Sequence, residues 1–378
     1  MIKKISIQNF KSLAGLDMEC SNLNILCGLN SMGKSSIIQT LLLLRQSFKK
    51  ETLQNEGLSL QGDLASIGTA KEALYQFADK DEISFKIDFE EEEGTNLKEW
   101  VFSYQSNSET DEYNYAESEI IPYGEGTKVP EDIDSLPLFQ PDKFNYLSAE
   151  RWVKETYIIA DYAVSKQRSL GKYGENTAYY LLRYGTEIKV DKSLLYKDTE
   201  IELLDNQVSA WMNEISPGSK VIVERIPGMN HVKLSYEFSE PGYTSDQVSP
   251  LNVGFGMTYV LPVVVALLSA KPGDILLIEN PESHVHPKGQ SAIGRLMAKV
   301  AALGVQLFVE THSDHIINGV RVAVKEGVPY NSVKIQFVRR DQGMASQLDD
   351  LRIDRNGELS EYPVDFMDEW SNQLLKLL

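Results

Sequence analysis

The sequence predicts an α/β fold built on a mixed, largely parallel sheet, and two stretches of the chain carry that prediction. In the first, a short apolar run over residues 22–27 leads into a glycine-rich loop and then an apolar helix over residues 36–48. In the second, apolar strands over 275–278 and 305–309 flank a helical stretch over about 290–303. Strands that alternate with helices are typical of a parallel sheet covered by helices.

Antiparallel pairs and further helices are expected to accompany this sheet. Residues 2–8 alternate apolar and polar side chains, and two more alternating runs, 83–89 and 100–104, flank an acidic turn. This pattern predicts an antiparallel β subdomain near the N-terminus. Apolar spacing over 175–184 and 201–215 predicts helices, which we assign to a helical lobe.

These patterns divide the chain into four parts. Residues 1–104 form the N-terminal part of a head with the glycine-rich loop and the β subdomain, and residues 143–325 form the remainder with the helical lobe. Residues 326–378 are expected to form a small C-terminal region. Residues 105–142 are acidic and rich in proline, so a surface loop or insertion is expected there.

The composition is that of a soluble globular protein, and its charge disfavours two classes of partner. Hydrophobic residues make up 42% and charged residues 24%, and the formal net charge is −18. Such an acidic surface repels nucleic acid and anionic membrane. Cys20 and Cys27 are too few for a disulfide framework. No apolar run approaches the ~18 residues of a membrane span, so a cytoplasmic location is expected.

The glycine-rich loop has the pattern of a phosphate-binding P-loop. It reads Gly-Leu-Asn-Ser-Met-Gly-Lys-Ser over residues 28–35, between a buried strand and a helix. In such a loop, backbone N–H groups converge on phosphate oxygens at a helix N-terminus. Lys34 is expected to contact the β- and γ-phosphates of ATP, Ser35 to bind Mg²⁺, and Ser36 to touch the α-phosphate. Further contacts with the nucleotide are expected from Asn30, Ser31, Met32 and Gly33.

Polar residues follow both apolar strands of the second stretch. Ligands bind at the carboxyl ends of the strands in parallel sheets. Glu279, directly after the strand 275–278, is therefore expected to hold Mg²⁺ as a Walker B residue. His312 follows the strand 305–309 and is expected to contact the γ-phosphate or the attacking water.

Together these motifs resemble the head of the ATP-binding-cassette (ABC) type of ATPase, in the branch shared by RecF, SMC proteins and overcoming-lysogenization-defect (OLD) nucleases. Besides the P-loop, the resemblance rests on Glu279 to Pro287, similar to the Walker B and D-loop segment, and on Glu310 to Ser313, similar to the switch-histidine loop. In that family two heads sandwich ATP, and a signature segment of one head completes the site of the other. The resemblance implies a homodimer or higher even oligomer, with the signature at residues 252–258 and Gly254 and Gly256 beside the nucleotide.

Two departures from that family bear on the reaction. The branch usually has Asp-Glu where this chain has Glu279-Asn280, so an amide occupies the catalytic-base position. Two outcomes stay open, slow hydrolysis or a base role for Glu282. Gly254 also replaces the usual signature serine, so contact with the γ-phosphate would rely on backbone N–H groups at the N-terminus of the helix that starts near Gly256.

Three further segments, 146–151, 171–177 and 356–367, resemble a narrower family of stand-alone prokaryotic ATPases with a short C-terminal domain of uncharacterised function. Members recur beside nucleases in phage-defence systems, and the ATPase subunit of Septu is broadly similar. The resemblance implies that ATP-dependent dimerisation regulates a separate effector, such as a nuclease. Two roles stay open for Arg151: contact with the nucleotide or a partner, or a surface salt bridge.

Other interpretations carry less weight. An OLD-like nuclease would carry a Toprim domain after the head, and Asp349, Asp350 and Asp354 are better explained as polar turn residues near the C-terminal strand. A RecF-like DNA-repair ATPase conflicts with the net charge, and a transporter motor conflicts with the Walker B segment. His284 and His286 lack the further ligands of a zinc site, and a D-loop explains the same residues more simply.

Overall fold

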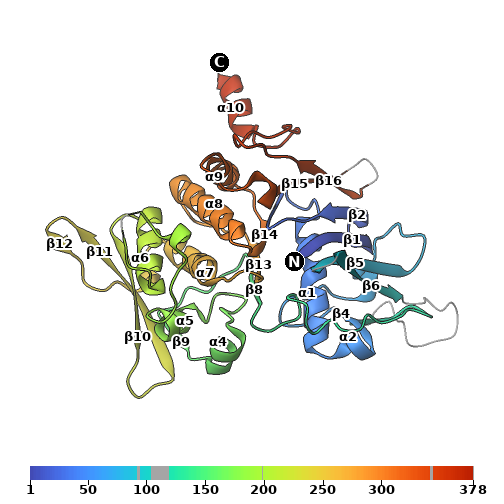
Figure 1. The fold of residues 1–378 in the computed structure, drawn as a ribbon, viewed down its shortest axis with the longest axis horizontal. Helices are drawn as coiled ribbons and strands as arrows, with labels where there is room; N and C mark the ends of the chain where they lie inside the picture. Colours follow the sequence, from blue (N-terminus) through green and yellow to red (C-terminus); the bar gives the residue numbers. More distant parts are fainter. Residues whose placement is uncertain (92–93, 104–118, 198, 341–343, 378) are drawn as a thin grey trace.

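A six-stranded sheet lies at the centre of the computed structural model, which describes residues 1–91, 94–103, 119–197, 199–340 and 344–377 (Figure 1). Neighbouring strands are parallel except for the β15–β16 pair, so the prediction of a mixed, largely parallel sheet is confirmed. The strands in spatial order are β16 (Ser346–Leu351), β15 (Val333–Arg340), β3 (Leu23–Cys27), β14 (Gln306–Glu310), β13 (Ile275–Glu279) and β8 (Phe144–Leu147).

Smaller antiparallel sheets flank the central one, and the N-terminal one lies where the alternating runs predicted it. The N-terminal sheet has the order β2–β1–β5–β6, and it comprises β1 (Ile2–Phe10), β2 (Leu13–Glu19), β5 (Glu82–Glu91) and β6 (Gly94–Ser103). The sheet at the opposite end of the molecule in Figure 1 comprises β9 (Thr156–Ile158), β10 (Ser219–Arg225), β11 (His231–Glu240) and β12 (Tyr243–Thr244).

Helices cover both faces of the central sheet, because its strands are apolar on both sides. Within β14, Phe308 packs into the core shared with α1 (Lys34–Lys49), whereas Leu307 and Val309 pack into the core shared with α7, α8 and α9. These three helices span Phe255–Ser269, Pro287–Ala302 and Asp314–Lys325. The other helices are α2 (Thr52–Asn55), α3 (Ala70–Ala73), α4 (Asp161–Gln167), α5 (Thr177–Tyr184), α6 (Leu204–Ile215) and α10 (Glu369–Leu377). Across the described ranges, no helix is both long enough and apolar enough to cross a membrane.

Two further stretches contribute strands and buried residues to the fold. Part of the expected loop over 105–142, residues 105–118, lies outside the described residues, but the remainder is structured. There, β7 (Ile120–Pro122) pairs with β4 (Gly57–Ser59), and Leu138 and Phe139 are buried. The C-terminal stretch from residue 326 also contributes to the head, because β15 pairs directly with the P-loop strand β3.

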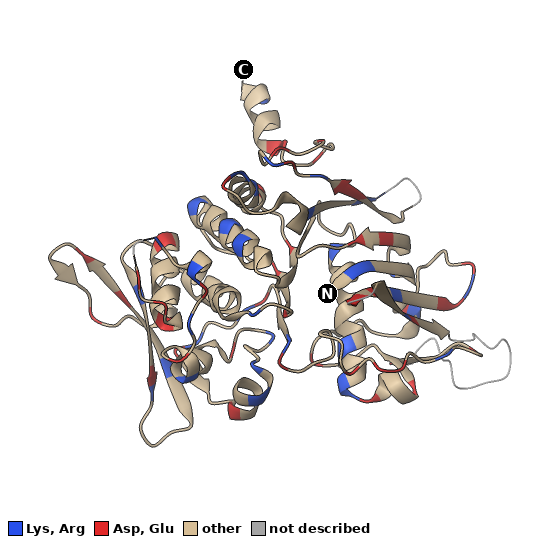
Figure 2. Ribbon diagram, viewed as in Figure 1, with Lys and Arg blue, Asp and Glu red and all other residues tan. Residues whose placement is uncertain are grey.

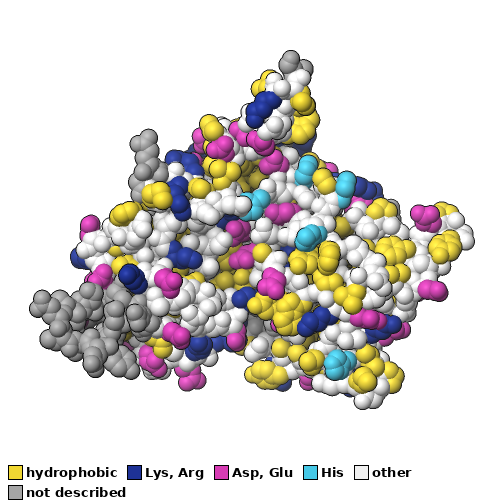
Figure 3. Space-filling model, turned by 180° about the vertical axis from the view of Figure 1, so that it is seen from behind, with side chains coloured by type: hydrophobic (Ala, Val, Ile, Leu, Met, Phe, Trp, Pro, Cys, Tyr) yellow, Lys and Arg dark blue, Asp and Glu magenta, His cyan; other side chains and the backbone are white. Residues whose placement is uncertain are grey.

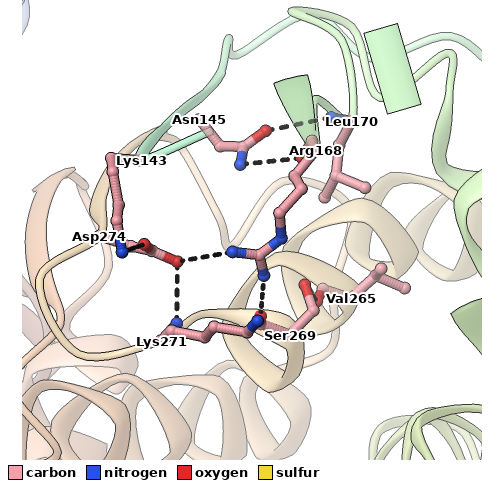
Figure 4. A network of polar contacts seen from close by, with 8 residues as sticks. All are labelled: Lys143, Asn145, Arg168, Leu170, Val265, Ser269, Lys271 and Asp274. Atoms are coloured by element: carbon pink, nitrogen blue, oxygen red, sulfur yellow. Dashed lines mark hydrogen bonds and ion pairs between the residues drawn. The ribbon is translucent and has the colours of Figure 1, made fainter. Parts of the chain in front are cut away.

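A buried carboxylate, that of Asp274, directly precedes β13, and Figure 4 shows its contacts. Glu279 lies at the other end of this strand. Asp274 is 5% exposed and accepts a hydrogen bond from the Lys271 backbone N–H at 2.9 Å. It also pairs with Lys143 at 3.4 Å and with Arg168 at 3.5 Å. Arg168 in turn donates to the Ser269 carbonyl at 2.7 Å, so the network joins the end of α7 to the loop before β13.

We expect Asp274→Ala to lower the free energy of unfolding by about 3 kcal/mol, because it leaves the Arg168 cation, whose side chain is only 18% exposed, without its carboxylate. Chemical denaturation followed by circular dichroism measures this loss. The matched control is Lys143→Ala, which removes a partly exposed partner of the same carboxylate and should cost less than about 1 kcal/mol. Equal losses in the two variants would contradict the assignment.

Candidate functional site

The P-loop, residues 28–35, connects β3 to α1 and depends on two glycines. Gly28 has a φ of +132°, and a Cβ there would lie 2.2 Å from the carbonyl oxygen of Val338 in β15. Gly33 has a φ of +109°, and a Cβ there would lie 2.4 Å from the Oγ of Ser346. Only glycine tolerates both the left-handed backbone and the close approach, so these residues fix the path of the loop.

The two C-terminal strands of the sheet hold the loop from one side. Arg340 at the end of β15 donates to the Ser31 carbonyl at 2.6 Å, and Ser346 of β16 donates from its hydroxyl to the Met32 carbonyl at 2.6 Å. Asn30 and Ser31 remain exposed, whereas Ser36 is buried in the first turn of α1. The loop is therefore anchored through its carbonyls, which leaves its tip accessible.

Lys34 and Ser35 open the helix α1 and lie on different sides of it. The Lys34 ammonium donates to the carbonyls of Gly28 at 3.0 Å and Leu29 at 2.7 Å, so the side chain folds back over the loop. Burial lowers the pKa of Lys34, and the nearby Glu310 carboxylate opposes that shift. Ser35 is exposed, and its hydroxyl donates to Oε1 of Glu310 at 3.0 Å.

The partner of Ser35 is a residue that sequence reasoning did not select as a site residue. Glu310 ends β14 and is 6% exposed, and it lies in register beside Glu279 at the end of β13. Burial raises the pKa of Glu310, and the charge of Glu279 raises it further. The signal available in the sequence was the glutamate itself, because a carboxylate that ends a largely apolar strand needs a partner when it is buried.

Glu279 occupies the predicted position, but its carboxylate contacts neighbouring protein groups. Its Oε1 accepts from the Tyr146 hydroxyl at 3.1 Å, and its Oε2 accepts from the Ala149 backbone N–H at 3.2 Å. Burial raises the pKa of Glu279. Arg151 fixes the same turn, since its guanidinium donates to the Glu279 carbonyl at 2.5 Å and to the Asn280 carbonyl at 3.2 Å. Arg151 is 2% exposed, so the alternative of a surface salt bridge is wrong.

The turn after β13 is tied to the loop after β14 by Glu282. Its two carboxylate oxygens accept from the Thr311 hydroxyl and from the His312 backbone N–H, each at 2.8 Å. Asn280 has a φ of +43° and donates its N–H to the Glu310 carbonyl at 2.8 Å. The His312 side chain is exposed, and its pKa is lowered by partial burial and by the Lys34 charge. A neutral imidazole at pH 7 offers one donor and one acceptor nitrogen.

The signature-like segment lies at the same edge of the sheet, because it packs on the turn after β13. A Cβ on Gly256 would lie 2.2 Å from the His284 carbonyl oxygen, and the His284 ring contacts the rings of Phe255 and Tyr259 with centroids 5.9 and 4.9 Å apart. Gly254 caps α7 and is exposed, and a Cβ there would meet no atom of the described chain within 4 Å. Gly256 is therefore needed for close packing, whereas Gly254 leaves the surface at the N-terminus of α7 accessible.

The surface around this edge carries mixed charge. Figure 3 shows histidine side chains beside acidic ones on one face, and the exposed histidines are His284, His286, His312 and His315. His286 caps α8 by accepting from the Lys288 N–H at 3.3 Å. Basic residues gather on α8 (Figure 2). The carboxylate of Glu214, on α6, lies 3.9 Å from both Lys288 and Arg295 of α8. A nearby carboxylate therefore offsets part of the positive charge on α8.

Comparison with known proteins agrees with this geometry. Residues 23–318 match the family described as "AAA domain, putative AbiEii toxin, Type IV TA system", and residues 328–377 match the family described as "Protein of unknown function (DUF3696)". Among curated protein sequences, none matches this chain.

Solved structures of SMC head domains share the fold. One is the Smc head domain with an extended coiled coil bound to the C-terminal domain of ScpA from Pyrococcus furiosus, with 14% identity and a TM-score of 0.54 over 100% of this chain and 99% of that chain. Another is an SmcHead bound to the C-winged helix domain of ScpA, with 13% identity and a TM-score of 0.52 over 94% and 98%. The chain therefore belongs to the AAA-domain family of P-loop ATPases and has the ABC-type fold of SMC heads.

Proposed function

We propose that this protein binds ATP with Mg²⁺ at residues 28–36 and hydrolyses it slowly, and that ATP closes a dimer of two heads. One observation carries the proposal. The P-loop, the carboxylates of Glu279 and Glu310, and the His312 loop converge at the carboxyl edge of one parallel sheet. Ligands bind at this edge in α/β folds, and the N-terminus of α1 favours phosphate.

The residues at this edge suit a magnesium ion bound together with ATP. Mg²⁺ in nucleotide sites is held by one or two carboxylates, a hydroxyl and phosphate oxygens. Ser35 is exposed at the loop, and Oε2 of Glu310 is buried without a hydrogen-bond partner among the described residues. With Glu279 beside it in register, the site offers the oxygen ligands that the ion requires. When bound, the ion would neutralise charge on the β- and γ-phosphates.

Slow hydrolysis follows from the groups that surround the phosphate position. Asn280 offers an amide, which does not accept a proton at neutral pH. Both carboxylate oxygens of Glu282 already accept hydrogen bonds that hold the His312 loop, which supports a positioning role for Glu282 over a base role. The neutral His312 would accept a hydrogen bond from the attacking water or donate one to the γ-phosphate.

Dimerisation is supported by the surface around Gly254. This residue is open at the N-terminus of α7, and the neighbouring Leu251 and Phe255 are each 62% exposed. Large exposed apolar side chains beside a helix N-terminus suit a contact that a second head completes. The nucleotide of one head would then face the backbone N–H groups at Gly254 of the other.

We expect Gly254→Asp to abolish ATP-induced dimerisation while leaving ATP binding to the single head within about twofold of wild type. The backbone of Gly254 has a φ of −58°, and the added Cβ meets open space, so the fold tolerates the change. In the closed dimer, the new carboxylate would face the γ-phosphate, and like charges at contact distance repel strongly. Light scattering with ATP and Mg²⁺ measures the oligomer. Gly254→Ala is the matched control, and dimerisation of Gly254→Asp at wild-type affinity would refute this arrangement.

The output of the switch is proposed to pass to a separate effector, such as a nuclease, in antiviral defence. The description of the matched family names the AbiEii toxin and a type IV toxin–antitoxin system. The compared SMC heads are bound to domains of the partner ScpA. Nuclease chemistry in this chain itself gains no support from the aspartates considered above. Asp349 pairs with Arg339 at 2.6 Å and Asp350 with Lys334 at 2.8 Å along the β15–β16 pair, and Asp354 accepts N–H groups within its own turn.

A further inference from the structure

The end of β14 holds a carboxylate oxygen that the protein leaves without a partner. Glu310 is 6% exposed, and its Oε1 accepts from the Ser35 hydroxyl at 3.0 Å. Its Oε2 is buried and has no hydrogen-bond partner among the described residues. Leaving a buried acceptor unsatisfied is unfavourable, and such groups are rare in folded proteins. An oxygen of this kind beside an exposed P-loop hydroxyl indicates that a bound group completes the site.

The other acidic groups at this edge are already engaged. The carboxylate of Glu279 accepts from Tyr146 and Ala149, and that of Glu282 accepts from Thr311 and His312. Position 280, which carries the second carboxylate of the related ATPases, is an asparagine. Among these groups, Glu310 is thus the carboxylate that combines contact with the P-loop serine and an open oxygen.

We propose that Glu310 is the carboxylate that organises the magnesium ion of bound ATP, so that the acidic pair of this site is built across β13 and β14 instead of along β13. The proposal rests on the proposed function that ATP with Mg²⁺ binds at the P-loop. A serine hydroxyl has one donor and two acceptor lone pairs. By accepting the hydrogen bond from the Ser35 hydroxyl, Glu310 directs the lone pairs of that hydroxyl toward the ion. Its Oε2 accepts a hydrogen bond from a water of the ion, because Mg²⁺ retains several waters in such sites. Glu310 acts through Ser35 and water, and it is therefore a positioning residue.

The test measures the Mg²⁺ dependence of ATP binding in the full-length wild type, Glu310→Gln and Glu279→Gln. Calorimetric titrations with ATP are run in EDTA and then over a series of Mg²⁺ concentrations. Loss of an outer-shell ligand typically weakens metal affinity 10–100-fold. We expect Glu310→Gln to require at least about tenfold more Mg²⁺ to reach half of the maximal increase in ATP affinity. Its affinity for metal-free ATP should be unchanged or tighter. Glu279→Gln should raise the Mg²⁺ requirement less than Glu310→Gln does. Glu310→Asp, which keeps a carboxylate, should bring the Mg²⁺ requirement part of the way back toward that of the wild type.

A double-mutant cycle with Ser35→Ala tests the route through the serine. If Glu310 acts through Ser35, the shift in Mg²⁺ requirement of the double variant will be smaller than the product of the single shifts. Electron paramagnetic resonance of Mn²⁺ bound together with ATP, in place of Mg²⁺, gives a second measure of the coupling between Glu310 and Ser35.

Four outcomes would overturn the inference. A larger increase in the Mg²⁺ requirement of Glu279→Gln than of Glu310→Gln would indicate that Glu279 of β13, and not Glu310, organises the magnesium ion. An equal loss of metal-free and Mg²⁺-bound ATP affinity in Glu310→Gln would indicate a distorted loop. Normal ATP binding with an unchanged Mg²⁺ requirement would overturn the role of Glu310 and leave the proposed function standing. Failure of the wild type to bind ATP, with or without Mg²⁺, would instead overturn the proposed function and this inference with it.

Discussion

Replacing Lys34 with alanine is expected to weaken ATP binding by about 100-fold. The Lys34 ammonium folds back onto the carbonyls of Gly28 and Leu29, and it would turn to the β- and γ-phosphates when ATP enters. A hydrogen bond between charged groups contributes about 1.5–3 kcal/mol. Two such bonds at the lower value give about 3 kcal/mol, which corresponds to about 100-fold in the dissociation constant. Isothermal calorimetry with ATP and Mg²⁺ measures the change.

The control for this variant is Lys49→Ala, which removes the same charge from the exposed last turn of the same helix. Its affinity should stay within about twofold of wild type, because screening weakens the effect of a distant exposed charge. Circular dichroism of Lys34→Ala should match wild type, since the lysine amine contacts only carbonyls of its own loop in the described structure. Wild-type affinity in Lys34→Ala would refute the assignment of the P-loop as the nucleotide site.

The fold could be predicted from the sequence where local patterns repeat. The helix expected to start near Gly256 is α7 (Phe255–Ser269), and the strand expected over 305–309 is β14 (Gln306–Glu310). Their apolar patterns match the helix and strand periods. The position of β15 could not be predicted in this way. Its pairing with β3 joins residues about 310 apart in the chain, and no local pattern encodes which strand lies beside which.

The candidate site likewise has residues that local patterns in the sequence predict and residues that only the tertiary fold brings together. The P-loop could be recognised from its spacing, and Gly28 and Gly33 have the left-handed backbone that such a loop requires. Glu310 could not be assigned from the sequence, because its partnership with Ser35 arises only when β14 inserts between β3 and β13. The distinct roles of Gly254 and Gly256 likewise depend on what each Cβ would meet, which is set by the turn after β13.

The second large effect is expected for Arg151→Ala, which should lower the free energy of unfolding by about 4 kcal/mol. The guanidinium is buried and donates to the carbonyls of Glu279 and Asn280. Burial lowers the pKa of Arg151 to about 10, so the group is charged at pH 7. Truncation leaves two partly buried carbonyls without this donor, at about 1–3 kcal/mol each, and adds the cost of a cavity. Chemical denaturation measures the loss.

Comparison with two other variants separates packing from ligand contact at this position. Arg151→Lys keeps the charge but cannot reproduce the planar fork that spans both carbonyls, so it should fall between alanine and wild type in stability. Arg183→Ala removes an exposed arginine paired with Glu187 on the surface and should cost less than about 0.5 kcal/mol. If Arg151→Ala unfolds like wild type but loses ATP affinity, the guanidinium serves the nucleotide directly. If Arg151→Ala lowers both the free energy of unfolding and the ATP affinity, Arg151 acts by fixing the turn that carries Glu279 and Asn280.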